Sequence, residues 1–191
     1  MRKIHIATSR EIGRRCQDCV SDMASMEDCD IFISILYDKL LTPEFIASKK
    51  ACYNFHPGYL PDYRGSGAYS WVIINGESTA GVTLHLIDKD IDHGPILDRR
   101  VFPVKDTDTA ETLFHQAENI IYDMFKEWLP KLISGQHDLQ PNIGGHVYLR
   151  KDLDKAKDLT RFVRAFTFEG KDNAYYYNSK GEKIELKYAP S

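Results

Sequence analysis

Apolar runs and helical repeats alternate along the first third of the chain. Residues 30–37 form a continuous apolar run rich in β-branched side chains, which is typical of a central parallel strand. Residues 4–7 and 51–56 predict two further strands, and residues 11–24 predict a helix between the first two. The pair Thr42-Pro43 predicts the start of another helix, because threonine caps a first turn and proline fits within it. This order of elements predicts an open α/β sheet.

The next part of the chain predicts a further strand and a long helix. Residues 81–87 show the alternation of a strand that ends shortly before Asp92. Residues 108–111 resemble a capping box, and apolar side chains recur at helical spacing over residues 113–128. Pro130 is expected to kink the end of this helix, because its ring disrupts the ladder of helical hydrogen bonds.

The composition changes near residue 136. Residues 1–135 predict one α/β domain, residues 136–149 a connecting loop, and residues 150–191 an accessory element. The last part carries 10 Lys and Arg against 7 Asp and Glu, a net charge of +3 that leaves −6 for the rest of the chain. A short helix is expected at residues 153–166, followed by a hairpin that turns at residues 178–181. This hairpin could cover a sheet edge or contact a substrate, and the sequence fits both interpretations.

Charge and hydropathy narrow the range of functions. A net charge of −3 and a pI near 6.2 provide no long-range attraction for nucleic acid or an anionic membrane, so the predicted partner is a small molecule. The first residues lack the apolar stretch of a signal peptide, and no window approaches the ~18 apolar residues of a spanning helix. We therefore expect a cytoplasmic protein that binds neither nucleic acid nor membrane.

The spacing of cysteine and histidine does not favour a metal centre. Cys16-x-x-Cys19 lacks the second close pair of a zinc ribbon, since Cys29 and Cys52 lie far apart in the sequence. We therefore expect free structural thiols and no metal. The residues of a minor alternative metal site are His56, His85, Asp92 and His93.

Three polar residues fall at the ends of predicted strands, where open α/β sheets bind their ligands. Asn54 and His56 are two positions apart in one strand, so their side chains point to the same face. Acyl transfer to an amine needs a hydrogen-bond donor for the oxygen that becomes negative, and Asn54 supplies one. The reaction also needs a group that moves protons near neutral pH, which suits His56. Asp92 can orient the imidazole and favour its cation.

Each of these residues also has a structural interpretation. An Asn-x-His pair taken alone more often packs and caps a strand end. Asp92 could belong to a tight loop with local hydrogen bonds, and residues 64–65 to a simple turn. Pro57 and Gly58 end the strand in either case, because proline lacks an N–H and glycine accepts a positive φ.

The motifs taken together resemble a known family. The three motifs are Asn-x-His-Pro-Gly-x-Leu-Pro-x-Tyr-Arg-Gly at residues 54–65, Gly-Val-Thr-Leu-His at residues 81–85 and Asp-x-Gly-Pro-Ile at residues 92–96. They are similar to those of the 10-formyltetrahydrofolate-dependent formyltransferases, which formylate methionyl-tRNA, glycinamide ribonucleotide or amino sugars on nucleotides. The resemblance covers about residues 30–135 and implies a Rossmann-like open, mostly parallel sheet.

The resemblance also implies roles for particular residues. Asn54, His56 and Asp92 match the family's catalytic Asn, His and Asp, and 10-formyltetrahydrofolate is the implied formyl donor. Two segments match those that bind the pterin of the folate, largely through backbone groups. These segments are Lys39-Leu40-Leu41 and Ile87-Asp88-Lys89.

Two departures from the family pattern affect the expected acceptor and fold. Gly58 stands where most members carry serine, so a hydroxyl contact to the substrate is absent and a different acceptor is implied. Only 53 residues precede Asn54, whereas relatives fit additional β-α units there, so we expect a shortened sheet. An edge left open by this shortening predicts a homodimer, or coverage by the hairpin at the end of the chain.

The expected acceptor is an amino sugar attached to a nucleotide. A tail of ~40 residues with a net charge of +3 is too small and too weakly charged to bind tRNA. The tail also resembles the short extension of sugar-amine formyltransferases, in which an Arg-Ala-Phe segment precedes an aromatic hairpin. Gly58, Arg64 and Arg164 are the predicted substrate-binding residues. Two alternatives remain, namely a formyltetrahydrofolate hydrolase that uses water in place of the amine, and a folate-binding module without turnover.

Overall fold

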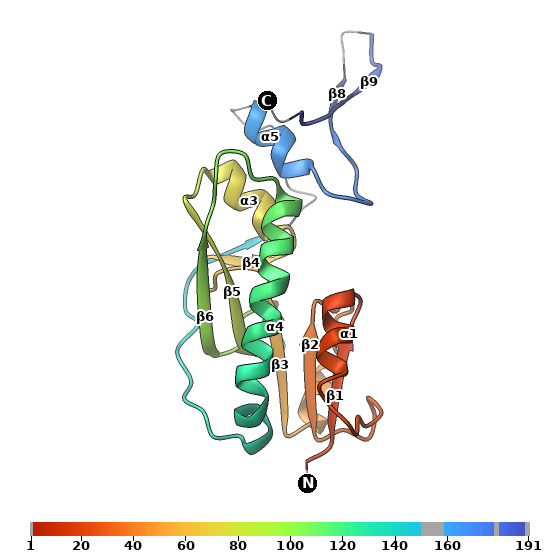
Figure 1. The fold of residues 1–191 in the computed structure, drawn as a ribbon, viewed down its shortest axis with the longest axis vertical. Helices are drawn as coiled ribbons and strands as arrows, with labels where there is room; N and C mark the ends of the chain where they lie inside the picture. The colour runs from red at the N-terminus through yellow and green to blue at the C-terminus, as the bar shows by residue number, and fades with distance from the viewer. Residues whose placement is uncertain (1, 150–158, 178–179, 190–191) are drawn as a thin grey trace.

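A five-stranded sheet, in the order β1-β2-β3-β5-β6, forms the centre of the protein (Figure 1). The computed structural model describes residues 2–149, 159–177 and 180–189. The strands β1 (Ile4–Thr8), β2 (Ile31–Ile35) and β3 (Ala51–His56) are parallel neighbours. The strand β5 (Thr79–Leu86) runs antiparallel to β3, and β6 (Ile96–Pro103) runs antiparallel to β5. Four of the five strands therefore point the same way, which confirms the predicted open, mostly parallel α/β sheet.

The parallel half of the sheet has the expected crossover helices. All five residues of β2 are buried, as its continuous apolar run predicts. The helix α2 (Pro43–Ser48) begins at the predicted cap, where the Thr42 hydroxyl accepts a hydrogen bond from the Phe45 amide at 3.2 Å. The carboxyl end of β3 therefore lies beside the ends of β1 and β2.

The first helix is shorter than its pattern predicts. The helix α1 (Glu11–Gln17) ends seven residues before the predicted boundary at residue 24. Instead, Met23 forms an isolated bridge with Ile4, and the Ala24 amide donates to the Ile4 carbonyl at 2.9 Å. The chain leaves the helix because these contacts satisfy backbone groups on the open edge of β1.

The helix α4 (Ala110–Ser134) is continuous for 25 residues (Figure 1). The helix continues through Pro130 to Ser134, so this residue does not end it, and the predicted kink stays a prediction. The capping box is formed by Thr109 and Thr112 rather than by residues 108 and 111. The buried face packs on the sheet, where the rings of Phe55 and Phe125 lie 6.0 Å apart.

Several elements near the site carry no clear periodic pattern in the sequence. The helix α3 (Ala68–Asn75) is apolar on most sides, so it lacks the amphipathic stripe of a surface helix. The three-residue strand β4 (Tyr63–Gly65) pairs in parallel with β7 (His146–Tyr148), which lies in the segment predicted as a loop. The interpretation of residues 64–65 as a simple turn is therefore wrong.

The tail packs on the body through its helix. In α5 (Leu159–Phe166), the Ala165 carbonyl accepts a hydrogen bond from the Ser70 hydroxyl of α3 at 2.7 Å. The strands β8 (Ala174–Tyr177) and β9 (Lys183–Leu186) form the predicted hairpin, and Figure 1 shows it extending away from the sheet. Among the described residues it pairs only with itself, so the predicted coverage of a sheet edge is wrong. Residues 153–158 of the predicted helix and residues 178–179 of the predicted turn lie outside the described residues.

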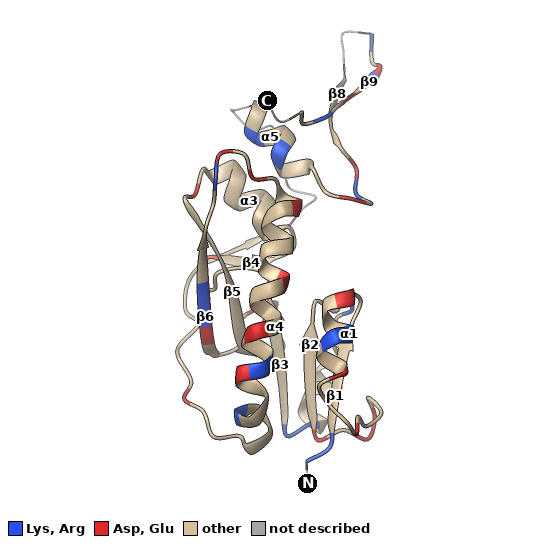
Figure 2. Ribbon diagram, in the orientation of Figure 1, with Lys and Arg blue, Asp and Glu red and all other residues tan. Residues whose placement is uncertain are grey.

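Charged residues of both signs are distributed over the body. Figure 2 shows acidic and basic positions interspersed along α4 and β6, while α5 carries Arg161 and Arg164. In the part of the chain that the structure describes, no helix is both long and apolar enough to cross a membrane.

Candidate active site

The predicted catalytic residues lie together at the end of β3. Asn54 and His56 follow the alternation of the strand, and antiparallel pairing places His85 of β5 directly opposite Asn54. The loop after β5 then brings Asp92 to the same place, with Asp92 itself in the left-handed region at a φ of 48°. Three segments of the chain thus contribute four polar side chains to one cluster, which we call the catalytic cluster: Asn54, His56, His85 and Asp92.

Asp92 is the centre of this cluster. Its Oδ2 lies 3.4 Å from Nδ1 of His56, and its Oδ1 lies 3.5 Å from Nε2 of His85. Asn54 donates through Nδ2 to Oδ1 of Asp92 at 3.3 Å and contacts Nε2 of His85 at 3.1 Å. The Gly65 amide of β4 donates to Oδ2 at 2.9 Å. The carboxylate is therefore held from four sides.

The ring of His56 is fixed from two directions. Its Nε2 donates to the Tyr63 carbonyl at 2.6 Å, so the nitrogen left to accept a proton is Nδ1, which faces Asp92. The side chain is only 4% exposed. A proton bound at Nδ1 would therefore lie between the ring and a carboxylate.

Burial and nearby charges shift the pKa values of His56 and Asp92. Burial lowers the pKa of His56 below its usual 6.5, and the attraction of Asp92 opposes this effect only in part. Burial would raise the pKa of Asp92, but the electrostatic effects of the neighbouring His56 and His85 and the hydrogen bond from the Gly65 amide together hold it below its usual value. Near neutral pH the cluster thus combines a neutral imidazole with an ionised carboxylate, which is the state of a general base.

Gly58 has a structural role that its sequence position does not reveal. A Cβ at this position would lie 2.5 Å from Nε2 of His56 and 2.7 Å from the Tyr63 carbonyl oxygen. Gly58 is not among the glycines with positive φ, so the expectation that it uses this freedom is wrong. The absence of a side chain here is explained by the space that the bond between His56 and Tyr63 occupies. Whether Gly58 also contacts a substrate stays a prediction.

We expect Gly58→Ala to lower kcat by ~10-fold or more, because displacement of a catalytic ring by even 1 Å is costly. Steady-state kinetics, with thermal unfolding to verify the fold, measures this effect. Gly144→Ala is the matched control, since nothing lies within 4 Å of a Cβ there, although its φ of 83° will cost some stability. Parental kcat in Gly58→Ala would show that the ring position seen here is not the active one.

Arg64 supports the catalytic cluster indirectly, through Asn142. Its buried guanidinium donates to the carbonyl and side-chain oxygens of Asn142 at 2.9 and 3.0 Å. Asn142 in turn donates to the carbonyls of Asp92 at 3.0 Å and Gly94 at 2.9 Å. Arg64 therefore positions the loop of Asp92, and the predicted contact with substrate stays a prediction. Asn142 was not expected from the sequence, because it lies 50 residues from Asp92 in a segment that reads as a connecting loop.

Arg164 lies in a different place from the catalytic cluster. It is buried on α5 and donates to the backbone carbonyl of Asp106, which precedes α4. This contact joins the tail to the body. The predicted role of Arg164 in binding substrate stays a prediction, and the structure provides a structural reason for the residue.

The two predicted pterin-binding segments lie over the same part of the sheet. Leu41 and Ile87 both pack against a small cluster that includes Phe32 and Cys52. Leu40 is 86% exposed, and no hydrogen bond within the described residues involves the backbone of Leu40 or Leu41. Unpaired amide and carbonyl groups beside an exposed apolar side chain fit a flat polar ring such as a pterin. Lys39, Asp88 and Lys89 complete the two segments, and their role in pterin binding stays a prediction.

The structure shows the state of the cysteines and the positions of the residues of the alternative metal site. All four cysteines are free, and burial, followed by the effect of Cys19, raises the pKa of Cys16 to about 12. The alternative metal site does not assemble as a whole, because His93 lies against Asp88 at 2.8 Å rather than against the other histidines. Asp90 completes a small exposed group with these two residues.

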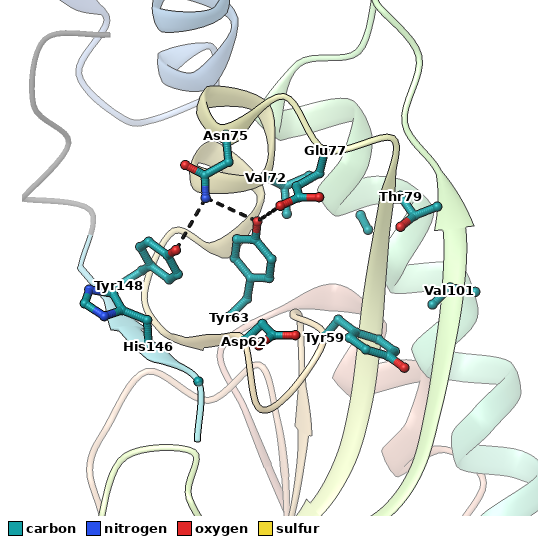
Figure 3. A pocket seen from close by; sticks show the side chains of 12 residues that line it. Tyr59, Asp62, Tyr63, Val72, Asn75, Glu77, Thr79, Val101, His146 and Tyr148 are labelled. Carbon is teal, nitrogen blue, oxygen red and sulfur yellow. Dashed lines mark hydrogen bonds between the residues drawn. The ribbon is translucent and has the colours of Figure 1, made fainter. Parts of the chain in front are cut away.

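A large cavity lies beside β4 and β7, which contribute Tyr63, His146 and Tyr148 to its lining. It has a volume of about 650 Å³ and is lined by aromatic and polar side chains from several elements (Figure 3). Figure 3 shows the Tyr63 hydroxyl between Glu77, which accepts its hydrogen at 2.8 Å, and Asn75, which donates to it at 3.2 Å. The side chain of Tyr63 thus lines this cavity while its carbonyl holds His56. Asp62 and Glu77 make the lining acidic, and it includes no Lys or Arg among the described residues.

Comparison with known proteins identifies the family. The model of the formyl transferase family matches residues 7–129. The GDP-perosamine N-formyltransferase of Brucella melitensis is 32% identical over 195 residues, which cover 87% of this chain and 75% of that protein. The chain belongs to the formyl transferase family. The methionyl-tRNA formyltransferase of Thermodesulfovibrio yellowstonii is 36% identical over 127 residues, which cover 64% of this chain and 41% of that protein.

Solved structures agree with this fold. A sugar N-formyltransferase from Shewanella superposes with a TM-score of 0.86 at 19% identity, covering 100% of this chain and 98% of that chain. The N-formyltransferase from Helicobacter canadensis, solved with folinic acid and dTDP-3-aminofucose, has a TM-score of 0.75 at 22% identity. This second match covers 88% of this chain and 82% of that chain. The predicted formyltransferase fold is confirmed.

Proposed function

We propose that this formyl transferase moves a formyl group from 10-formyltetrahydrofolate to the amine of an amino sugar attached to a nucleotide. The observation that carries the proposal is the buried catalytic cluster, in which Asp92 holds His56 at 3.4 Å and Asn54 at 3.3 Å. Groups of these types serve acyl transfer to an amine without a serine or cysteine nucleophile. The curated relative that matches 87% of the chain is named for an amino sugar linked to GDP.

The residues present fit the folate donor. The exposed Leu40 and the unpaired backbone groups of residues 40–41 lie near the loop that follows β5. Residues 40–41 and the loop after β5 would hold such a donor, which would supply an activated formyl group near Asn54 and His56 at the end of β3. Two structures of similar fold were solved with folates bound, which supports the same donor for this chain.

His56 provides the base for this transfer. The amine that attacks the formyl carbon must lose a proton, and the neutral imidazole can take it up at Nδ1. The resulting imidazolium lies between the Asp92 carboxylate and the Tyr63 carbonyl, and both stabilise its charge. His56 would then return this proton to the nitrogen that leaves the formyl carbon of the donor. His56 thus returns to its neutral state.

Asn54 provides the donor for the formyl oxygen. Its amide directs both hydrogens into the cluster, toward His85 at 3.1 Å and Asp92 at 3.3 Å. Transfer requires one of these hydrogens to move to the oxygen as negative charge develops there. We expect the longer hydrogen bond, from Asn54 to Asp92, to be the one that breaks. His85 then keeps the amide oriented, which assigns it a positioning role.

A small acceptor fits the charge of the protein better than tRNA. Binding of nucleic acid depends on neutralising several phosphates with a basic surface. The net charge of −3 and the interspersed signs in Figure 2 provide no such surface among the described residues. Residence in the cytoplasm and assembly as a homodimer belong to the same proposal, since a cytoplasmic folate would supply the donor and, in the described part of the chain, the edge strands β1 and β6 are covered only at isolated bridges, which leaves backbone groups for association.

Mass spectrometry tests the proposal. The protein is incubated with 10-formyltetrahydrofolate and a panel of nucleotide-linked amino sugars that includes GDP-perosamine. We expect one acceptor to gain the mass of a carbonyl group, at a rate that depends on acceptor concentration. Release of free formate without any acceptor would instead show a hydrolase. Folate binding without either product would show a binding module, and both of these outcomes contradict the proposed transfer.

A further inference from the structure

A second, smaller cavity lies between the body and the tail. Its volume is about 200 Å³, below the roughly 300–1,000 Å³ of complete small-molecule sites, so it can hold only part of a large ligand. The body contributes Pro57, Ser66 and Phe114 to its lining, and the tail contributes Phe168 and Lys171. The tail thus builds one wall of this cavity.

The cavity borders the catalytic cluster through the backbone. Pro57 directly follows His56 in the chain. Ser66 directly follows Gly65, whose amide donates to Oδ2 of Asp92 at 2.9 Å. A ligand group seated here would therefore lie next to the segments that hold the catalytic base and its carboxylate.

The chemistry of the lining favours an anion beside a ring. Lys171 is the charged residue of the lining, and its ammonium has no hydrogen bond or ion pair among the described residues. A second cation lies close by, because the Arg10 guanidinium is 5.4 Å from the Phe114 ring centroid and 5.9 Å from that of Phe168. Among the residues that the structure describes, no carboxylate contributes to the lining. The carboxylate of Glu111, next to the lining residue Ala110, accepts the Glu169 amide at 2.9 Å.

The two aromatic rings provide an apolar surface beside these cations. Phe114 and Phe168 meet edge to face, with ring centroids 5.2 Å apart. The helix α3 starts in the same wall, and Gly67 at its N-cap position provides no side-chain cap. The amides of its first turn add to the preference for an anion that Lys171 and Arg10 establish.

The larger cavity of Figure 3 does not fit such a ligand. Its lining carries the carboxylates Asp62 and Glu77 and no Lys or Arg among the described residues, so it would repel phosphate. The two cavities thus differ in charge, and the smaller one suits the anionic part of an acceptor.

We propose that the small cavity binds the diphosphate of the nucleotide-linked acceptor, through Lys171 with Arg10 nearby. Phe168 then packs against the nucleoside ring that is next to the diphosphate. This inference rests on the proposed function for the identity of the acceptor. It assigns to the tail a direct role in recognising the acceptor, carried by Lys171 and Phe168 rather than by Arg164. The amino sugar then extends from the cavity toward His56.

Calorimetry of the full chain with GDP, UDP and dTDP, compared with guanosine, uridine and thymidine, tests this site. We expect the parent protein to bind one diphosphate more tightly than its nucleoside. Lys171→Ala should weaken the binding of that diphosphate by roughly tenfold or more and leave the affinity for the nucleoside unchanged, because only the phosphate contact is lost. Lys171→Arg should restore most of the affinity for the diphosphate. Phe168→Leu should lower the affinity for both the diphosphate and the nucleoside, because the aromatic ring that packs against the ligand is lost.

Lys187→Ala is the matched control, since it removes the same charge from an exposed position of the tail outside the cavity. An equal loss of diphosphate affinity in Lys187→Ala and Lys171→Ala would overturn the inference. A parent protein that binds no diphosphate more tightly than its nucleoside would overturn it as well. Kinetics separate this failure from that of the proposed function. If the parent transfers formyl groups and Lys171→Ala keeps the parental acceptor KM, the site is wrong and the function stands. If Lys171→Ala loses diphosphate binding but the parent transfers nothing, the site stands and the function is wrong.

Discussion

Replacing His56 with alanine should lower kcat by ~10²-fold or more and change folate affinity little, because general acid-base groups act mainly in the transition state. The reason lies in the position of Nδ1, which faces Asp92 at 3.4 Å in a side chain that is 4% exposed. Without this nitrogen the catalytic cluster lacks the neutral imidazole to which we assign the proton of the amine. Steady-state kinetics and a folate-binding titration measure the two quantities separately.

His115→Ala is the matched control for this variant. His115 is an exposed histidine on α4 that pairs with Glu118, so its loss should leave kcat unchanged. Because His56 is buried, thermal unfolding must show that His56→Ala is folded under the assay conditions. Turnover close to that of the parent in folded His56→Ala would reject the role assigned to this residue.

Replacing Asp92 with asparagine should lower kcat by ~10²-fold and move the acidic limb of its pH profile to lower pH. The pKa of His56 is below 6.5 because of burial, and Asp92 alone among its charged neighbours raises it. Activity requires neutral His56, so in the parent the limb lies below pH 6.5 and activity is lost as the pH falls through the pKa of His56. Removing the negative charge lowers this pKa further, which places the limb of the variant below that of the parent.

The double variant His56→Ala/Asp92→Asn distinguishes one step from two. If both residues act on one proton transfer, the double variant should be little slower than the slower single variant. Losses that multiply would show that the two residues act in separate steps. An acidic limb that moves to higher pH in Asp92→Asn would contradict the electrostatic role of Asp92.

The central residues of the site could be predicted because their signals are local. The two-residue spacing of Asn54 and His56 in an apolar strand places both side chains on one face, and the proline after them ends the strand. The strand before Asp92 was recognisable, but β5 runs antiparallel to β3, so its end alone does not place Asp92 at the carboxyl end of β3 and the family resemblance supplied that position. Family resemblance then assigned the roles, because residue type and strand register alone also fit a packing pair.

The residues that support the site could not be predicted, because their partners are distant in the sequence. Asn142 holds the loop of Asp92 across 50 residues, and no pattern in its own segment signals this contact. Arg64 suggested a substrate contact by its charge, but its guanidinium is buried against Asn142. Gly58 suggested a change of acceptor, whereas the space between His56 and Tyr63 provides the physical reason for a glycine.

The elements that the sequence did not predict share a physical cause. The helix α3 is apolar on most sides because it packs between the sheet and α5, so its 3.6-residue period is hidden. The strands β4 and β7 have three residues each, too few for alternation to be recognised. Pro130 does not end α4, because tertiary packing of the buried face, which includes Trp128 and Leu132, overrides the local preference.

Transfer of an isotope-labelled formyl group tests the central claim most directly. The labelled folate donor is mixed with a nucleotide-linked amino sugar and either parent protein or His56→Ala, and the label is traced in the acceptor amide and in free formate. We predict that the parent places the label in the acceptor and that His56→Ala does so ~10²-fold more slowly. Label that appears only in formate, or equal transfer by parent and variant, would contradict the account.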